Sequence, residues 1–270
     1  MIDSIINSSP IGIFDSGIGG LTVVREILKK LPRENLIYLG DTARVPYGTK
    51  SSKTVITYSQ SNAGFLISKG IKLLVVACNT ASAVALPSLR WDFEIPIIGV
   101  IEPGARKAVR ATKTGKVGVI GTPSTIKSNA YKKAMESIAP EIKVYSKACP
   151  LFVPLAEEGW TDGEIAELTV KKYLGHFKES AMDVLILGCT HYPLLKPMIQ
   201  KVMGEDITLV DSAEETALEI KGVLEENAIS NKNSSIPQRE FYLTDVSETF
   251  ISIAGRFLGE EIQQVEQIDL

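Results

Sequence analysis

Two stretches of the sequence decide the fold: LLVVACNT at residues 73–80 and VLILGCTH at residues 184–191. Each begins with an apolar run that is long enough for one buried strand and too short for a helix of several turns. A cysteine comes after each run, polar residues follow the cysteine, and a helical pattern comes next. Parallel α/β sheets bind ligands at the carboxyl ends of their strands. We therefore expect Cys78 and Cys189 at two equivalent strand ends.

The apolar periods around these stretches predict a regular alternation of strands and helices. Such alternation is typical of α/β proteins whose parallel sheets are covered by helices. The predicted strands are 11–14, 36–39, 73–77, 95–100, 117–120, 142–145, 184–187 and 207–210. The predicted helices are 21–31, 51–68, 79–91 (interrupted by Pro87), 103–111, 126–138, 162–177 and 193–203, and 147–159 is predicted as a loop.

The spacing of these elements indicates an internal duplication. The first strands of the two halves are 106 residues apart, and so are the second strands. The two cysteines are 111 residues apart, and the fourth strands 112. A near-constant offset across elements in the same order is the signature of a repeat. The predicted fold is therefore α/β with two pseudo-symmetric lobes, each a four-stranded parallel sheet flanked by helices, and with a site in the cleft between them.

The tail after Val210 has no counterpart in the first half. Residues 211–227 predict a helix, because Asp211 and Ser212 precede two glutamates in the first turn. A short strand at 241–243, a helix at 246–257 and a last strand at 262–265 follow. We expect the tail to pack on the first lobe. The predicted domains are then residues 1–98 with 210–270, and residues 99–209.

The composition is that of an ordinary globular protein. Of 270 residues, 44% are hydrophobic and 23% are charged, and the net charge of −3 without a long basic run disfavours nucleic acid as a main partner. No apolar stretch approaches the roughly 20 residues of a membrane span. Residues 1–10 show no secretory signal, and three cysteines are an odd number for a disulfide framework. We expect free thiols in the cytoplasm, and without CxxC spacing no metal site.

Two thiols that face one substrate carbon from opposite sides suit one reaction especially well. One thiolate removes a proton, and the other thiol returns a proton on the opposite face. A thiol has a pKa of about 8.5, which a helix N-terminus or a nearby charge lowers. Helical patterns follow Cys78 and Cys189, so both sites are expected to receive such help. The chemistry is racemisation or epimerisation beside a carboxylate, without a cofactor.

The neighbouring polar residues fit an amino-acid substrate. Asp15, at the end of the first strand, is suited to an ammonium group. His191 is suited to relaying the proton of Cys189, and Glu157 to orienting a partner. Neutral donors for a carboxylate are expected from Asn79, Thr80, Thr122, Thr125 and Thr190, and the loop after the second strand holds Tyr47, Gly48 and Thr49.

Each of these features also has a structural interpretation. A cysteine at a strand end is often a small buried hydrophobe, and Cys149 is interpreted in that way. The glycine-rich loop 15–20 matches neither the dinucleotide nor the Walker pattern. Asp15 could cap the following helix, and Tyr47 could serve packing alone. His191 could make a purely structural hydrogen bond, and Glu157 could belong to a solvated surface pair. Because Cys78 and Cys189 occur in the same repeated context, a functional role is favoured over a structural one for this pair.

Five motifs of the chain resemble those of the glutamate racemases in the aspartate/glutamate racemase superfamily. The motifs span most of the chain up to Val210. A sixth segment, 211–217, also resembles the family, in which a glycine commonly follows the serine. The motifs are GIFDSGIGG at 12–20, GDTARVPYG at 40–48, CNTAS at 78–82, CPLFVPL at 149–155 and GCTHYP at 188–193.

This resemblance implies a cofactor-independent interconversion of L- and D-glutamate that supplies peptidoglycan synthesis and so cell shape. It implies that Cys78 acts on the D-enantiomer and Cys189 on the L-enantiomer, with Asp15, Glu157 and His191 assisting. It implies a homodimer, and with ten residues before Ile11 we expect no activator requirement. The implied substrate contacts are Asp15, Ser16, Pro46, Tyr47, Gly48, Cys78, Asn79, Thr80, Thr122, Thr125, Cys189 and Thr190.

Two other functions are compatible with the sequence. Aspartate racemases of the same superfamily would keep both cysteines and change the pocket for the distal carboxylate, although the segment 189–191 is of the glutamate type. A two-lobe module could also bind a sugar or an amino acid without chemistry.

Overall fold

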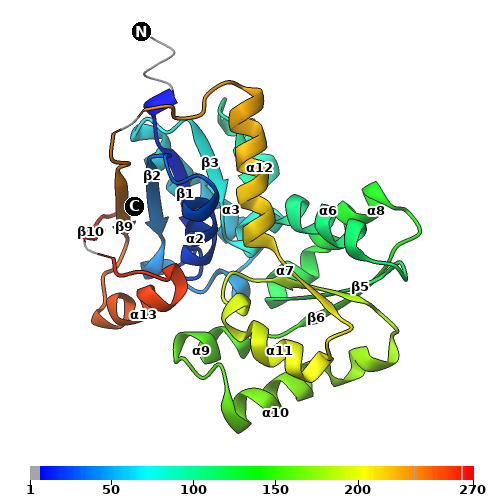
Figure 1. Cartoon of the computed structure of the whole chain (residues 1–270). Helices are drawn as coiled ribbons and strands as arrows, with labels where there is room; N and C mark the ends of the chain where they lie inside the picture. Colours follow the sequence, from blue (N-terminus) through cyan, green and yellow to red (C-terminus); the bar gives the residue numbers. More distant parts are fainter. Residues whose placement is uncertain (1–6, 234, 263) are drawn as a thin grey trace.

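The computed structural model describes residues 7–233, 235–262 and 264–270 and contains two parallel β-sheets in two halves (Figure 1). The first sheet has the strand order β10-β9-β2-β1-β3-β4, and the second has the order β6-β5-β7-β8. The strands of the first sheet are β1 (Ile11–Asp15), β2 (Leu36–Gly40), β3 (Leu73–Val76), β4 (Ile97–Gly99), β9 (Arg239–Leu243) and β10 (Glu266–Gln267). Those of the second sheet are β5 (Lys116–Gly121), β6 (Lys143–Ala148), β7 (Val184–Gly188) and β8 (Thr208–Asp211).

The two sheets share one arrangement, as the duplication predicts. The orders β2-β1-β3-β4 and β6-β5-β7-β8 are the same order in each half. This confirms the α/β class with two pseudo-symmetric parallel sheets. The prediction of four strands in each sheet is wrong for the first, because β9 adds to β2 with Leu36 opposite Arg239 and Gly40 opposite Leu243. β10 follows at the edge, at Glu266–Gln267. The strand predicted at 262–265 includes residue 263, which lies outside the described residues.

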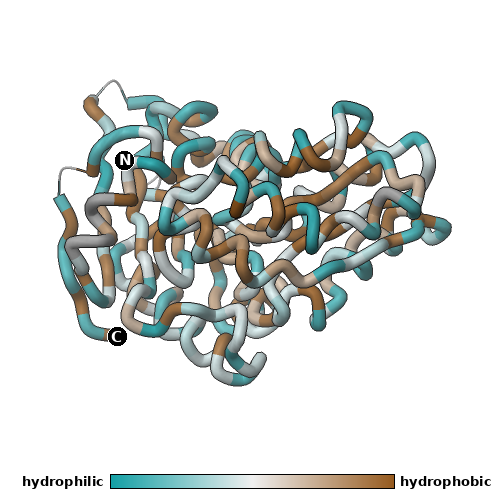
Figure 2. Tube along the Cα trace, turned by 90° about the horizontal axis from the view of Figure 1, so that it is seen from below, coloured by the Kyte–Doolittle hydropathy of each residue, from teal (hydrophilic) through white to brown (hydrophobic). Residues whose placement is uncertain are grey.

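Helices cover both sheets. They are α2 (Leu21–Lys30), α3 (Ser52–Ser68), α4 (Asn79–Val84), α5 (Leu86–Asp92), α6 (Ile101–Ala111), α7 (Pro123–Ser128), α8 (Ala130–Ile138), α9 (Phe152–Glu157), α10 (Gly163–Leu174), α11 (Lys196–Met203), α12 (Ser212–Glu226) and α13 (Glu248–Leu258). In Figure 2, the interior segments of the tube are mainly hydrophobic, and hydrophilic residues lie mainly on the outer segments. None of the helices in the described ranges is long and apolar enough to cross a membrane.

Three predictions of local structure need correction, two for helices and one for a loop. The helix predicted at 126–138 divides at Asn129, which has a left-handed backbone (φ 57°). The helix predicted at 193–203 begins as a 3₁₀ turn, η4 (Tyr192–Leu195), and becomes α-helical only in α11. The segment 147–159, predicted as a loop because of its prolines, contains α9. Pro154 lies in the first turn of α9, where a proline interrupts no intrahelical hydrogen bond, and Phe152 anchors the helix in the apolar core of the second half.

The tail joins the first half through its strands and through a buried ion pair. Lys72 Nζ lies 2.6 Å from Glu34 Oε2, and both side chains are almost fully buried. The same ammonium donates to the carbonyl of Ile229 at 2.8 Å, and Glu34 Oε1 accepts from the amide of Asn231. Asp211 is the last residue of β8 and caps α12 by accepting from Ala213, so the chain leaves the second sheet at this point.

Candidate active site

A cavity of about 160 Å³ lies where strand ends of the two sheets meet. It is small beside the roughly 300–1,000 Å³ of clefts for drug-sized ligands, and its size therefore suits a small metabolite. Its lining comes from both halves of the chain: Ser16, Val45, Pro46, Tyr47, Gly48, Thr49, Cys78, Asn79 and Thr80 from the first, and Thr122, Pro123, Pro150, Val153, Pro154, Cys189, Thr190 and His191 from the second.

Both predicted cysteines lie in this lining. Cys78 follows β3 and is the N-cap residue of α4, and Cys189 follows β7. Each is a free thiol, exposed by only 5% and 7% respectively. Burial, reinforced by the carboxyl of Asp15, raises the pKa of Cys78 to about 12, although a hydrogen bond with Ser16 opposes the rise. Cys78 is therefore a neutral thiol at neutral pH in this environment.

The expected help from helix N-termini is smaller than the sequence pattern implies. α4 after Cys78 has only six residues. The helix after Cys189 starts seven residues later, at Lys196, with the 3₁₀ turn η4 in between. The macrodipole effect falls off within the first turn of a helix, so Cys189 gains little from α11.

Cys189 instead has a charged neighbour in His191. The Nδ1 atom of His191 lies 3.9 Å from the sulfur of Cys189, and its Nε2 atom lies 2.9 Å from Oε1 of Glu157. Burial lowers the pKa of His191, but hydrogen bonds to Cys189 and Glu157 together raise it to about 10. His191 is thus protonated at neutral pH, and it places a positive charge beside the sulfur of Cys189.

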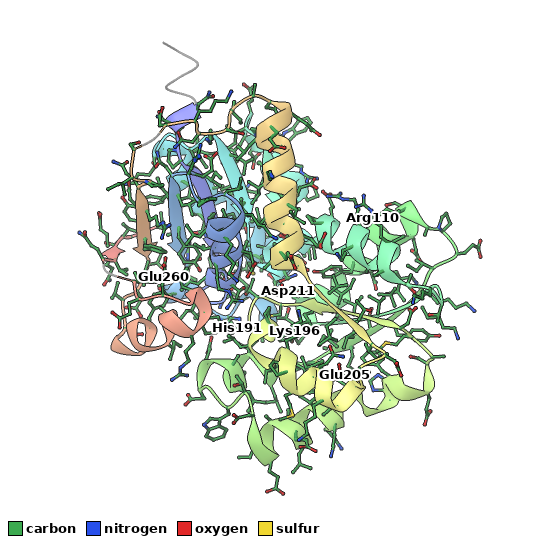
Figure 3. All side chains as sticks on the ribbon, in the orientation of Figure 1. Arg110, His191, Lys196, Glu205, Asp211 and Glu260 are labelled. Carbon is green, nitrogen blue, oxygen red and sulfur yellow. The ribbon has the colours of Figure 1, made fainter. Side chains whose placement is uncertain are left out.

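The tail contributes to this arrangement in a way that the sequence did not indicate. The ring of Phe257 in α13 meets the ring of His191 edge to face, with centroids 5.3 Å apart. Arg256 Nη1 lies 3.4 Å from the carbonyl oxygen of Glu157. In Figure 3, His191 lies between the first half and the yellow helix α11. No local motif marks Phe257 or Arg256, because both act across a long separation in the chain.

Asp15 lies behind the cavity wall. Its side chain is fully buried and is absent from the lining. Its Oδ2 accepts from the amide of Gly17 at 3.0 Å, while Oδ1 has no hydrogen-bond partner among the described residues. Burial raises the pKa of Asp15, and the charge of His191 partly offsets the rise. The carboxyl nevertheless lies close enough to Cys78 and His191, which line the cavity, for charges to interact. A direct contact with an ammonium group stays a prediction.

Three threonines form a hydroxyl cluster across the two halves. Thr80 Oγ1 lies 2.9 Å from Thr122 Oγ1 and 3.2 Å from Thr125 Oγ1, and the latter two are 3.0 Å apart. Thr80 and Thr122 reach the cavity, and Thr125 supports them from behind. Among the described residues of the lining there is no lysine or arginine, and these hydroxyl groups are neutral donors that lie beside the cavity.

A buried network fixes the loop that carries Tyr47. The hydroxyl of Tyr47 donates to Asp41 and accepts from Asn62 Nδ2 at 3.1 Å. Asp41 also accepts from Arg44 Nε at 2.8 Å and from Thr244 Oγ1 at 3.0 Å. The loop lies close to the second half, since a Cβ atom on Gly48 would fall 2.7 Å from Thr122 Cβ. Tyr47 is therefore both a packed residue and part of the cavity wall.

Most residues proposed from the sequence converge on this cavity. Ser16, Pro46, Tyr47, Gly48, Cys78, Asn79, Thr80, Thr122, Cys189, Thr190 and His191 line it, whereas Asp15, Thr125 and Glu157 lie in a second layer. The apolar lining residues Val45, Pro123, Pro150, Val153 and Pro154 were not proposed as site residues. Apolar walls have no local chemical signal. The described ranges contain no group of three or more potential metal ligands.

Comparisons with known proteins agree with this geometry. The family model for Asp/Glu/Hydantoin racemase matches residues 11–220. Over 260 residues the chain is 55% identical to a glutamate racemase from Geobacter metallireducens, covering 96% of each. It is 48% identical over 265 residues to a glutamate racemase from Enterococcus faecalis, covering 98% of this chain and 97% of that one.

Solved structures give the same picture. The crystal structure of glutamate racemase from Francisella tularensis in complex with D-glutamate has a TM-score of 0.92 at 42% identity, covering 97% of this chain and 98% of that chain. An aspartate racemase from Picrophilus torridus is similar in fold alone, with a TM-score of 0.58 at 18% identity over 83% of this chain and 99% of that one.

Proposed function

The chain belongs to the Asp/Glu/Hydantoin racemase family, and we propose that it interconverts L-glutamate and D-glutamate without a cofactor. The observation that carries this proposal is the presence of Cys78 and Cys189 in the lining of one small cavity. Similarity to glutamate racemases over nearly the whole chain supports the choice of substrate. The low identity to aspartate racemase makes aspartate the weaker candidate.

The proposed reaction moves one proton off the α-carbon and another onto its opposite face. With L-glutamate, the thiolate of Cys189 takes the α-proton, and the electron pair left on the carbon delocalises into the carboxylate. Cys78, a neutral thiol, then donates its proton from the other side. With D-glutamate the roles reverse. General acid–base catalysis of this kind contributes about 10²- to 10⁴-fold for each well-placed group.

The second layer supports the two thiols unequally. Protonated His191, held by Glu157, stabilises negative charge on Cys189. Among the described residues no such cation acts on Cys78, whose ionisation is opposed by burial and by the carboxyl of Asp15. We propose that the ammonium group of the bound amino acid offsets the charge of Asp15 and so permits Cys78 to ionise. Thr80, Thr122 and Asn79 are proposed to hold the carboxylates.

The wider role follows the same proposal. We propose that the product D-glutamate supplies peptidoglycan synthesis and that the protein acts as a homodimer in the cytoplasm. The two-domain division, residues 1–98 with 210–270 and residues 99–209, is proposed on the strand connections: β9 pairs with β2, and α13 packs on α2. Three free thiols within the described ranges are compatible with a reducing compartment.

The direct test is to incubate the purified protein with each substrate and to follow optical rotation. L-Glutamate is expected to lose its rotation completely, because the two enantiomers are equal in free energy. L-Aspartate is expected to change at least about 100-fold more slowly, since a shorter side chain leaves the groups for the distal carboxylate unpaired. Faster loss with aspartate would favour the aspartate racemase alternative. Binding of glutamate without any loss of rotation would favour a non-catalytic module.

A further inference from the structure

Tyr131 is a buried side chain outside the cavity that contacts the neighbours of both cysteines. It belongs to α8 in the second half, is 3% exposed, and is absent from the cavity lining. Its aliphatic neighbours form the core between α6, α8 and the second sheet. A tyrosine at such a position is expected to bury its hydroxyl only where hydrogen-bond partners are present.

The hydroxyl of Tyr131 joins three segments. It accepts a hydrogen bond from Nδ2 of Asn79 at 2.8 Å, and Asn79 directly follows Cys78. It lies 2.8 Å from Oγ of Ser212, the first residue of α12. Because an accepting hydroxyl still has its own proton to donate, Tyr131 can satisfy Asn79 and Ser212 together. The bond to Asn79 crosses from the second half to the first.

The ring of Tyr131 packs against the strand end that carries the other cysteine. A Cβ atom built on Gly188 would lie 3.0 Å from Tyr131 Cε2, and Gly188 directly precedes Cys189. On its other edge, a Cβ atom on Gly104 would lie 3.4 Å from Cε1. Glycine at position 188 is therefore what permits the ring to approach the backbone beside Cys189.

We propose that Tyr131 is a positioning residue that holds the strand ends of Cys78 and Cys189 at a fixed separation. The hydroxyl fixes the first strand end through Asn79, and the ring fixes the second through Gly188. This inference rests on the proposed racemase function. It assigns to Tyr131 the alignment of the two thiols with each other, whereas the residues of the lining align the substrate.

If Tyr131 fixes the distance between the two sulfurs, its loss should affect reactions that need both cysteines more than reactions that need one. Racemisation needs both sulfurs in line with one carbon at the same time. Elimination of HCl from 3-chloroglutamate needs only one: a thiolate takes the α-proton, the electron pair forms the Cα=Cβ bond, and chloride leaves. The resulting enamine takes up water and releases ammonium and 2-oxoglutarate. Loss of the Tyr131 contacts should therefore impair racemisation far more than elimination.

The test compares the two reactions in Tyr131→Phe, which keeps the ring and removes the hydroxyl. The ratio of racemisation kcat for glutamate to elimination kcat for each enantiomer of 3-chloroglutamate is expected to fall about 10- to 100-fold, since misplacement by 1 Å costs about 100-fold. Tyr173→Phe, on α10 in the same half, is the matched control and should leave the ratio unchanged.

The wild-type protein separates failure of this inference from failure of the proposed function. If wild type does not racemise glutamate, the function itself is wrong. If wild type racemises glutamate and Tyr131→Phe keeps the wild-type ratio, the positioning role is overturned. A parallel loss of both reactions would also overturn it, because that result indicates only a damaged fold. Should Tyr131→Phe fail to fold, Ser212→Ala carries the test: the ratio should fall by a smaller factor, and an unchanged ratio contradicts the proposal.

Discussion

Replacing either Cys78 or Cys189 by serine is expected to lower glutamate racemisation by about 10²- to 10⁴-fold. A hydroxyl is a far weaker acid than a thiol, so the substituted side can neither remove nor return the α-proton at a useful rate. Both side chains line the cavity, and the cost of a buried hydroxyl left unpaired is about 1–3 kcal/mol. The fold is therefore expected to survive. Cys149→Ser is the matched control, because Cys149 is fully buried in the apolar core of the second half and lies outside the cavity lining.

The two variants should differ in what they retain. Cys78→Ser keeps Cys189, and should still eliminate chloride from the L-enantiomer of 3-chloroglutamate. Cys189→Ser keeps Cys78, and should act on the D-enantiomer. Release of chloride from each enantiomer, measured separately, checks this assignment. Full racemisation by both variants would contradict a two-thiol mechanism, and equal elimination of both enantiomers by one variant would contradict the assignment of faces.

His191 is expected to stay protonated through neutral pH and to titrate near pH 10. Its hydrogen bonds to Cys189 and Glu157 outweigh burial and raise its pKa to about 10. The folded protein thus binds this proton more tightly than the unfolded chain, in which a histidine has a pKa of about 6.5. The stability gained from this proton is complete below about pH 6.5 and is lost as the pH rises through about 10.

The titration can be read by NMR, because the sequence has only two histidines. The Cε1 proton of His191 should shift with a midpoint near pH 10, and His176→Gln identifies the other signal. Glu157→Gln keeps an oxygen acceptor for Nε2 but removes the negative charge, so the midpoint should move down. It should also lower deprotonation of L-glutamate, where Cys189 is the base. A wild-type midpoint near 6.5 would contradict the charged neighbour proposed for Cys189.

Strands and helices of the two repeats could be predicted because buried parallel strands are continuous apolar runs. The strand before Cys78 and the strand before Cys189 are entirely buried, so their apolar character is unbroken. β9 gives a weaker signal, since only Tyr242 and Leu243 in it are buried. The apolar pattern of an edge strand does not state which edge it joins. The six-stranded sheet therefore became evident only from the pairing of β9 with β2.

Site residues could be predicted where a reactive side chain directly follows a recognisable strand pattern. Cys78 and Cys189 follow apolar runs and precede polar segments, which is a local pattern. Phe257 and Tyr131 have no such pattern, because their contacts with His191 and Asn79 join residues far apart in the chain. The position of Asp15 was also beyond local reasoning. Whether a carboxyl at a strand end is part of the cavity lining or lies behind it depends on the packing of the whole wall.

The most direct test of the two-thiol mechanism is the deuterium content of both enantiomers early in the conversion of L-glutamate in ²H₂O. Cys189 removes the α-proton on one face, and Cys78 returns a solvent-derived deuteron on the other. The D-glutamate formed should therefore carry deuterium at Cα, while the remaining L-glutamate keeps its proton. D-glutamate that retains the original proton would mean that one group carries it across. Deuterium entering L-glutamate as fast as D-glutamate appears would equally contradict two separate thiols.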